Sequence, residues 1–303
     1  MKNILFRTDS SSKIGIGHVM RSLVLAKQYP KDNIKFAVQN LPKNINRKIK
    51  DAGYAIETLK TNNIDECIQL IKKLKIDLII IDHYDIKYKQ EKKIKEQTGI
   101  QIFVLDDTYE KHYCDILLNH NIGANKLKYR GLVPENAELR CGENFALIRE
   151  EFIIEKKKRK SLKNNKRILV SMGGTDAGHL NVKILEILLN FKNIKVDIIT
   201  TNANLNLDEL KILCYEHRNF DLHIETNKMA TLMNQASLII TTPSVTINEV
   251  YYMDIPFIAI KIAENQNEIY KFLHKKKYPT MDHFDPKVLN DIIMTVMDGL
   301  GHE

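Results

Sequence analysis

The chain has 303 residues and carries 46 Lys and Arg against 38 Asp and Glu, a net charge of +8. This length predicts two domains, and 44% hydrophobic with 28% charged residues is the composition of a globular protein, which excludes a disordered chain. No apolar run approaches the ~18 residues of a membrane-spanning helix, and the start MKNILFRTD is too poor in apolar residues for a signal peptide. We therefore expect a cytoplasmic protein with no membrane partner.

Short apolar runs alternate with amphipathic segments along the first half of the chain. The runs predict buried strands at 3–7, 34–38, 78–82, 101–106 and 115–119. Between them, apolar residues recur every three or four positions and predict helices at 18–29, 64–75 and 87–97. Strands that alternate with helices predict a mainly parallel sheet covered on both faces.

The same alternation restarts near Arg167. Strands are predicted to begin at 167, 196, 221, 237 and 256, and a last helix at 286–300. We therefore predict an α/β protein with two facing, doubly wound, Rossmann-like domains, residues 1–155 and 165–303, and an interdomain cleft. The run KKKRK at 156–160 fits a solvated linker. A binding patch is the alternative, but no aromatic residues interleave the run, so no nucleic-acid partner is expected.

The loop that follows the first strand holds the first candidate site. In GIGH, Gly15 and Gly17 let the backbone bend and approach a ligand, and the next helix turns free N–H groups toward it. His18 stands at the start of that helix, where the helix dipole favours a neutral imidazole that can act as a general base. The alternative is a histidine that only caps or packs.

Three strand ends in the second half of the chain also carry candidate ligand-binding residues. Gly173 and Gly174 of GGTD are typical of a turn that presents amides to a diphosphate, although a plain turn gives the same pattern. Glu249, next to Asn248, has the chemistry to accept both hydroxyls of a ribose, with a plain surface glutamate as the alternative. The segment AENQNE at 263–268 offers side-chain amides for sugar substituents, although polar helix caps explain it nearly as well.

A metal site is the alternative use of the first domain's carboxylates. Asp82, Asp106 and Asp107 stand at strand ends near His83, but aspartates in such places more often cap the next helix. The four cysteines form no C-x-x-C pair. We expect neither a metal nor a cofactor.

Several long stretches resemble known enzymes. The glycine-rich loop with its histidine, GGTD and TINE are similar to the GT-B nucleotide-sugar architecture, of which the glucosaminyltransferase of peptidoglycan synthesis is one relative. RTDSSSKIGIGHVMRSLVLAKQY, LIIIDHY, YRGLVPENAELRCGENFALIREEF, MGGTD and ENQNE look like the UDP-2,4-diacetamido-2,4,6-trideoxy-β-L-altropyranose hydrolases of pseudaminic acid synthesis. The matching stretches span most of residues 3–270, so the resemblance covers both predicted domains.

The resemblance implies roles for individual residues. The catalytic base falls on His18, an aromatic active-site residue on Tyr84 and a substrate-contacting asparagine on Asn265, with UDP near Gly173 and Glu249. Arg21 or another cation would help the amides to hold the diphosphate charge. The full set of predicted substrate-binding residues is Arg7, Gly15, Gly17, Arg21, Tyr84, Gly173, Gly174, Thr175, Asn248, Glu249 and Asn265.

The resemblance also implies the reaction. Water, deprotonated by His18, would attack the anomeric carbon with inversion and release UDP and 2,4-diacetamido-2,4,6-trideoxy-L-altrose. A GT-B glycosyltransferase that uses a UDP-sugar donor and a non-catalytic nucleotide-binding module are the alternatives. The expected partner is a small-molecule UDP-sugar, and protein partners stay open.

Overall fold

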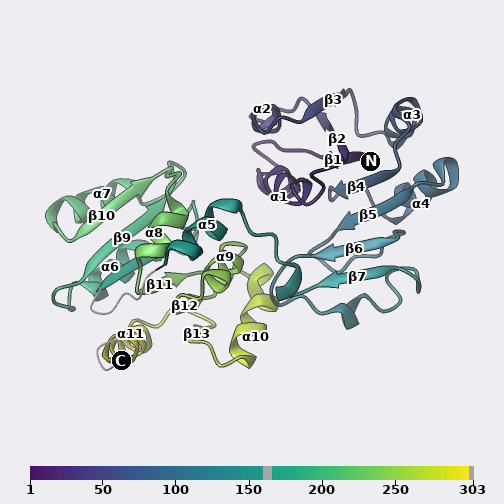
Figure 1. Cartoon of the computed structure of the whole chain (residues 1–303). Coiled ribbons are helices and arrows are strands. Elements are labelled where there is room, and N and C mark those ends of the chain that lie inside the picture. Colours follow the sequence, from purple (N-terminus) through teal and green to yellow (C-terminus); the bar gives the residue numbers. More distant parts are fainter. Residues whose placement is uncertain (160–165, 300–303) are drawn as a thin grey trace. The chain divides into compact units, whose positions relative to one another are not determined.

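The chain divides into two compact units, each built around its own parallel sheet. In the computed structural model, residues 1–159 and 166–299 are described, and the two units are Met1–Leu147 and Ile148–Glu303. Figure 1 shows both as α/β layers, with helices packed along the strands. Among the described residues, no helix is long and apolar enough to cross a membrane.

The first unit holds a seven-stranded sheet in which every pairing is parallel. The strand order is β3-β2-β1-β4-β5-β6-β7. The strands are β1 (Asn3–Thr8), β2 (Asn33–Gln39), β3 (Ala55–Leu59), β4 (Leu78–Asp82), β5 (Gln101–Leu105), β6 (Ile116–Asn119) and β7 (Glu138–Cys141). In the middle of the sheet, Phe6 pairs with Phe36 on one side and Ile80 on the other.

Helices cover both faces of this sheet. The short helix α2 (Asn46–Asp51) and α1 (Gly17–Ala26) pack on one face, while α3 (Ile64–Leu74) and α4 (Tyr88–Thr98) pack on the other. Because alternate residues of each central strand point into one core or the other, the strand LIIID at β4 is buried along its whole length. Two 3₁₀ turns, Lys126–Tyr129 and Glu143–Phe145, follow β6 and β7.

The second unit repeats the pattern with a six-stranded sheet. Its order is β10-β9-β8-β11-β12-β13, again parallel throughout. The strands are β8 (Arg167–Ser171), β9 (Lys195–Thr200), β10 (Phe220–Ile224), β11 (Leu238–Thr241), β12 (Phe257–Ile260) and β13 (Thr280–Met281). The helices are α5 (Glu150–Lys158), α6 (Asn181–Leu188), α7 (Leu207–Glu216), α8 (Met229–Gln235), α9 (Thr246–Met253), α10 (Asn267–Lys275) and α11 (Pro286–Gly299), with a 3₁₀ turn at Glu264–Gln266.

The predicted strands and helices are confirmed over the described residues, outside which Leu300 lies, and apart from α5 the elements that the sequence missed are short or lie at the lateral edges of the sheets. Strands β3 and β7 carry mostly half-exposed side chains, so they lack the apolar run that marks a buried strand. Strand β13 has two residues and α2 has six, too few to show a periodicity. The positions of β3, β7 and β13 are decided by pairing with β2, β6 and β12, which the sequence does identify.

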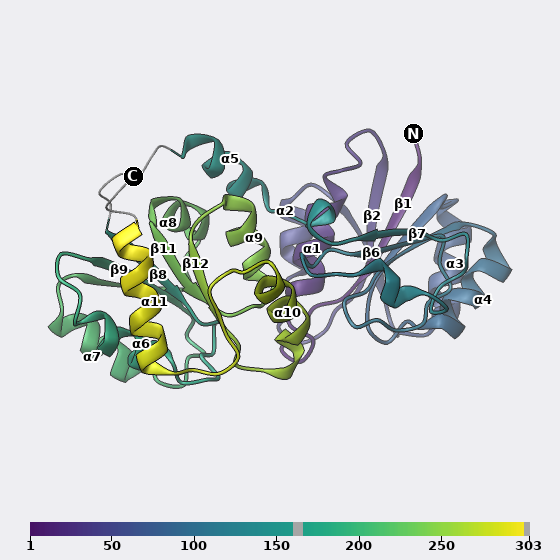
Figure 2. The same cartoon turned by 90° about the horizontal axis from the view of Figure 1, so that it is seen from below.

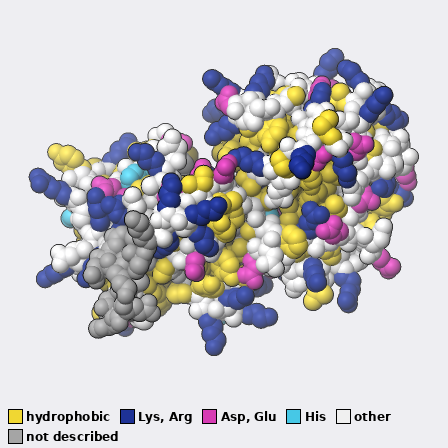
Figure 3. Space-filling view, viewed as in Figure 1, with side chains coloured by type: hydrophobic (Ala, Val, Ile, Leu, Met, Phe, Trp, Pro, Cys, Tyr) yellow, Lys and Arg dark blue, Asp and Glu magenta, His cyan; other side chains and the backbone are white. Residues whose placement is uncertain are grey.

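The lysine-rich run is not a solvated linker over the part that the structure describes, which corrects that prediction. Lys156–Lys158 is the last turn of α5, and the Lys156 ammonium donates to the carbonyl of Tyr252. Arg159 donates to the carbonyls of Asn234 and Ala236. Helix α5 therefore packs on α8 and α9 of the second unit, whereas Lys160 lies outside the described residues. The rest of the positive charge is scattered over the visible face (Figure 3).

In each sheet the strand order reverses at one place, which is the topological switch point of the fold. In the first unit the chain winds outward from β1 toward β3, then resumes on the other side at β4; in the second unit the same reversal separates β8 from β11. In Figure 2 these central strands are seen from below. In open α/β sheets the crevice at the carboxyl ends of two such strands is the usual binding position.

A buried ionic group ties α4 to the end of β5. His112 Nδ1 lies 2.7 Å from Glu91 Oε1, and its Nε2 lies 3.6 Å from Asp106 Oδ1, while the Tyr129 hydroxyl donates to Asp106 Oδ2 at 2.6 Å. Burial by itself would lower the pKa of His112, but the two carboxylates raise it to about 9. The imidazolium is therefore the form that this network stabilises.

We expect His112→Leu to lower the free energy of unfolding by about 3–5 kcal/mol, because it leaves two buried carboxylates without their cation. Since the folded pKa of about 9 lies above the ordinary value of 6.5, the stabilisation is fully present below pH 6.5 and is lost as pH rises through 9. Thermal unfolding of the wild type and the variant across this range measures the effect. A stability difference that does not shrink with rising pH would contradict it.

Candidate functional site

His18 and Asp82 form a buried pair where β1 and β4 diverge. His18 stands in the first turn of α1 and is 5% exposed, and its Nδ1 lies 2.6 Å from Oδ1 of Asp82, the last residue of β4. A carboxylate only accepts, so Nδ1 carries the hydrogen and Nε2 keeps its lone pair. Within the described chain, no hydrogen bond engages that Nε2. The pair is thus arranged as an oriented general base.

Arg21 locks the same carboxylate from the next turn of α1. Its Nε donates to Asp82 Oδ2 at 2.7 Å and its NH2 to Oδ1 at 2.6 Å, while NH1 donates to Asp107 Oδ2 at 2.7 Å. Arg21 NH2 lies 3.0 Å from His18 Nδ1 because both nitrogens donate to the same oxygen, Oδ1 of Asp82. Although burial would raise the pKa of Asp82, Arg21 and His18 hold it well below its usual range. Asp82 is therefore ionised at every working pH.

Tyr84 borders the histidine on its exposed side. Its ring meets the His18 ring edge to face at 4.6 Å, and its hydroxyl donates to Asp107 Oδ1 at 3.0 Å. Burial and the Asp107 charge raise the pKa of Tyr84 to about 12, so the side chain remains a neutral phenol. With half of its surface exposed, it is the member of the cluster that a ligand can reach most easily.

The loop before His18 is held open by its own backbone. Ser11 and Gly15 pair through both amides, and Gly15 has a φ of +83°, which favours glycine. Gly17 begins α1, and a Cβ there would meet open space rather than protein. The cap residue Ile16 offers no side-chain hydrogen bond to the helix. The first amides of α1 are therefore left for a ligand.

Arg7 lies beneath the site and not on its surface. It is 1% exposed, and its NH2 donates to Asp9 Oδ2 and to Asn62 Oδ1, each at 2.8 Å. His83 Nε2 lies 3.1 Å from the same Asp9 oxygen. Burial would raise the pKa of Asp9, but His83 and Arg7 lower it to about 2. These contacts favour a role for Arg7 in holding the loop, and its predicted substrate contact stays a prediction.

The sequence singled out Asp82 and Asp107 as helix caps or, less often, metal ligands, and it missed their partnership with His18 and Arg21. No group of three or more His, Cys, Asp or Glu in the described chain has the arrangement of a metal site. The third carboxylate, Asp106, accepts from the amides of Thr108 and Tyr109 in its own loop. The available signal was that β1, β4 and β5 are neighbours in a doubly wound sheet, which brings their carboxyl ends together.

In the second unit, the GGTD loop is shaped to expose its amides. Gly173 has a φ of +90°, and a Cβ on Gly174 would lie 2.8 Å from the Thr201 methyl, so glycine is required at both positions. Asp176 accepts from the amides of Leu180 and Asn181 and so caps the start of α6. Gly173 and the predicted Thr175 are exposed at the carboxyl end of β8. This agrees with an anion-binding turn.

Glu249 and its neighbours follow β11 at the other side of the same reversal. Arg149 binds both Glu249 oxygens, at 2.6 and 3.0 Å, and the carboxylate is largely buried. Burial raises the pKa of Glu249 and Arg149 opposes that shift. Asn248 is buried beside it, whereas Asn265 is exposed on the 3₁₀ turn after β12. The partner Arg149 lies 100 positions away from Glu249, and no local pattern predicted the pair.

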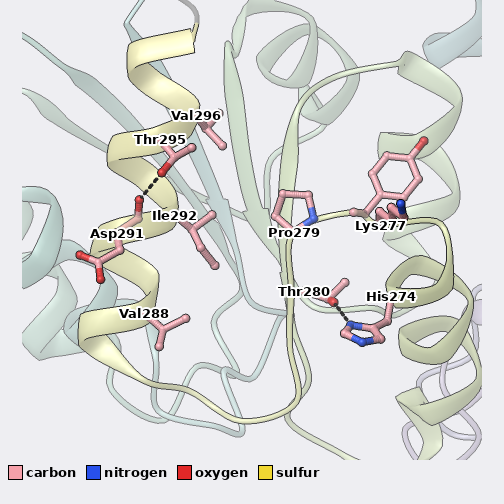
Figure 4. Close-up of a pocket in the computed structure, with 10 residues that line it drawn as sticks. His274, Lys277, Pro279, Thr280, Val288, Asp291, Ile292, Thr295 and Val296 are labelled. Carbon is pink, nitrogen blue, oxygen red and sulfur yellow. Dashed lines mark hydrogen bonds between the residues drawn. The ribbon is translucent and has the colours of Figure 1, made fainter.

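The second unit also has an open hollow of about 680 Å³ between α10, β13 and α11. Figure 4 shows Val288, Ile292 and Val296 of α11 on one side and Pro279 and Thr280 on the other. None of the predicted site residues lines it. The hollow is therefore separate from the strand ends that carry the candidate site.

Comparison with solved structures defines the class of protein. MurG of Acinetobacter baumannii has a TM-score of 0.68 at 16% identity, with 98% of this chain and 91% of that chain covered. HepE of Anabaena in complex with UDP has a TM-score of 0.66 at 12% identity, with 98% and 90% covered. The fold is that of GT-B proteins, as the resemblance implied.

A curated relative narrows the class to a family. The UDP-2,4-diacetamido-2,4,6-trideoxy-β-L-altropyranose hydrolase of Campylobacter jejuni is 41% identical over 275 residues, which are 91% of this chain and 97% of the relative. The chain therefore belongs to this hydrolase family. No family model matches the chain.

We expect Asp82→Asn to release His18 from its fixed tautomer. An asparagine has one acceptor oxygen, so either orientation turns an NH₂ group toward a donor of Arg21, and Nδ1–H loses its full acceptor. In mildly alkaline buffer, ¹⁵N NMR of the imidazole should change from a predominant Nδ1–H form to a mixture, and the free energy of unfolding should fall by about 3 kcal/mol. Ser22→Ala, which removes only a 3.4 Å contact with Asp82, is the matched control. An unchanged ¹⁵N pattern in Asp82→Asn would refute the assignment.

Proposed function

We propose that this chain hydrolyses UDP-2,4-diacetamido-2,4,6-trideoxy-β-L-altropyranose, releasing UDP and 2,4-diacetamido-2,4,6-trideoxy-L-altrose. The observation that carries the proposal is the His18–Asp82 pair: a buried carboxylate fixes one ring nitrogen and leaves the other free to take a proton. Membership of the hydrolase family supplies the substrate class. The glycosyltransferase alternative has no observation in its favour beyond the shared fold.

In the proposed mechanism, His18 Nε2 takes a proton from water as the water oxygen bonds to the anomeric carbon. The bond from that carbon to the diphosphate oxygen breaks, and its electron pair leaves with UDP. Asp82 stabilises the imidazolium that forms, because it accepts from Nδ1 throughout. A single base that activates one water implies direct displacement with inversion. The oriented base contributes roughly 10²–10⁴ to the rate.

UDP, we propose, binds to the second unit. The amides at Gly173, Gly174 and Thr175 would receive the diphosphate, and Glu249 with Asn248 would bind the ribose. Glu249 would then share its oxygens with Arg149, which opposes the rise in the pKa of Glu249 that burial causes. Asn265 would bind substituents of the sugar. Arg21, predicted as a cation for the diphosphate, donates to Asp82 and Asp107 in the ligand-free structure, and its contact with the diphosphate stays a prediction.

His18→Gln should bind UDP nearly as the wild type does but turn over at least ~10²-fold more slowly, because the amide has no basic nitrogen. Calorimetric titration with UDP and continuous detection of UDP release separate the two effects. His274→Gln changes a histidine that lines the hollow beside α11 and is the matched control. Near-normal turnover by His18→Gln would remove His18 from the mechanism.

Isotope labelling tests which bond breaks. Because the water attacks carbon in this mechanism, the reaction in ¹⁸O-labelled water should place the label on the anomeric oxygen and leave UDP unlabelled. Early NMR spectra should show the inverted anomer before mutarotation. Label in the β-phosphate of UDP would instead indicate attack at phosphorus and overturn the mechanism.

A further inference from the structure

His120 lies at the carboxyl ends of the strands, as the candidate base does, and it has no part in the proposed mechanism. It follows Asn119, the last residue of β6, and β6 pairs with β5 through Leu118 and Leu105. The amide of Asp106 donates to the Leu118 carbonyl at 3.0 Å, so the chain segments that carry Asp107 and His120 leave the sheet side by side. His120 therefore belongs to the row of strand ends that holds Asp82.

The imidazole of His120 is buried without hydrogen bonds. It is 2% exposed, and within the described chain neither of its ring nitrogens has a partner. The other buried imidazoles of this unit differ: His18 bonds Asp82 and His112 bonds Glu91. An unpaired buried polar group destabilises the folded state, so stability alone gives no reason to keep a histidine at this position.

The charges around His120 are those of the candidate site. Burial and the Arg21 guanidinium lower its pKa to about 4, against the opposing effect of Asp107 and Asp82. The ring is consequently neutral at physiological pH and has one N–H donor and one acceptor to offer. It adds no positive charge that would compete with an imidazolium at His18.

We infer that His120 is a positioning residue of the hydrolase, a reserve hydrogen-bond donor for Asp107 during turnover. In the ligand-free structure Asp107 receives the Tyr84 hydroxyl and Arg21. Tyr84 is half-exposed and free to turn its hydroxyl to a bound sugar, which would leave a carboxylate oxygen of Asp107 unpaired. The His120 imidazole, whose chain segment leaves the sheet beside that of Asp107, then supplies an N–H in its place, and Arg21 stays on Asp82. The inference rests on the proposed function.

The test uses His120→Leu and His120→Gln in the full chain, compared with the wild type on UDP-2,4-diacetamido-2,4,6-trideoxy-β-L-altropyranose. We expect His120→Leu to lower kcat by about 10–100-fold, since small displacements of an oriented base have effects of this size, with KM within about threefold. His120→Gln keeps an N–H donor and should recover a large part of kcat. UDP binding should not change in either variant.

Thermal unfolding provides the readout that a merely structural role would move. Because His120 has no hydrogen bond to lose, the melting temperature of His120→Leu should match or exceed that of the wild type. The matched control His112→Leu removes a paired buried imidazole and should melt lower.

Each other outcome counts against one proposal. Full activity in His120→Leu, or a melting temperature lowered as in His112→Leu together with unchanged kcat, would overturn the inference for His120. A raised KM with unchanged kcat would make His120 a substrate contact and would also overturn it. If the wild type itself released no UDP, the proposed function would fail, which the wild-type reaction shows before any variant is compared.

Discussion

The buried carboxylate of Asp82 is the group on which the candidate site depends. It ends a strand whose whole length is buried, and so its position is set by the core of the first unit. One carboxylate accepts from His18 and from two donors of Arg21, which explains how an ionised group persists at 1% exposure. A charge buried in this way is tolerated only because it is fully paired. The orientation of the base and the stability of this sheet edge therefore have the same origin.

Other charged side chains at the carboxyl ends of these strands are also paired. Arg7 is paired with Asp9, and Asp107 receives both Arg21 and Tyr84. These pairs involve no exposed lysine, and most use the planar guanidinium, which reaches two acceptors at once. His120 differs from them because both of its ring nitrogens are buried with no partner in the described part of the chain. A buried unsatisfied group needs an explanation, which is why its place beside the segment of Asp107 matters.

The second unit has the same sheet topology, but its candidate site uses backbone amides in place of buried charged side chains. Its loop after β8 holds Gly173 at a φ that favours glycine and Gly174 where a Cβ would meet the Thr201 methyl, as in a turn that presents backbone amides. Backbone amides bind anions without carrying a net charge. An anion site can therefore form at this loop without a buried cation. The acidic residue nearby, Glu249, is held by Arg149, and the pair has no net charge to repel a diphosphate.

The sequence by itself determined the two α/β units, their buried strands and the two glycine-containing loops, GIGH and GGTD, that carry candidate site residues. Those predictions rest on local patterns, since a continuous apolar run or a three-to-four spacing is visible within one segment. The resemblance also rests on contiguous segments, and so it could single out His18, Gly173 and Tyr84 as candidate site residues.

Only the tertiary structure decided which residues act together. Asp82 is 64 positions from His18, Arg149 is 100 from Glu249, and His120 is brought to the edge solely by the pairing of β6 with β5. The lysine-rich run forms the end of α5, and Lys156 and Arg159 donate to carbonyls at α9 and at the end of α8, contacts that no local pattern records. Partnership between charges depends on the order of strands in the sheet, and that order follows from long-range packing of the whole unit.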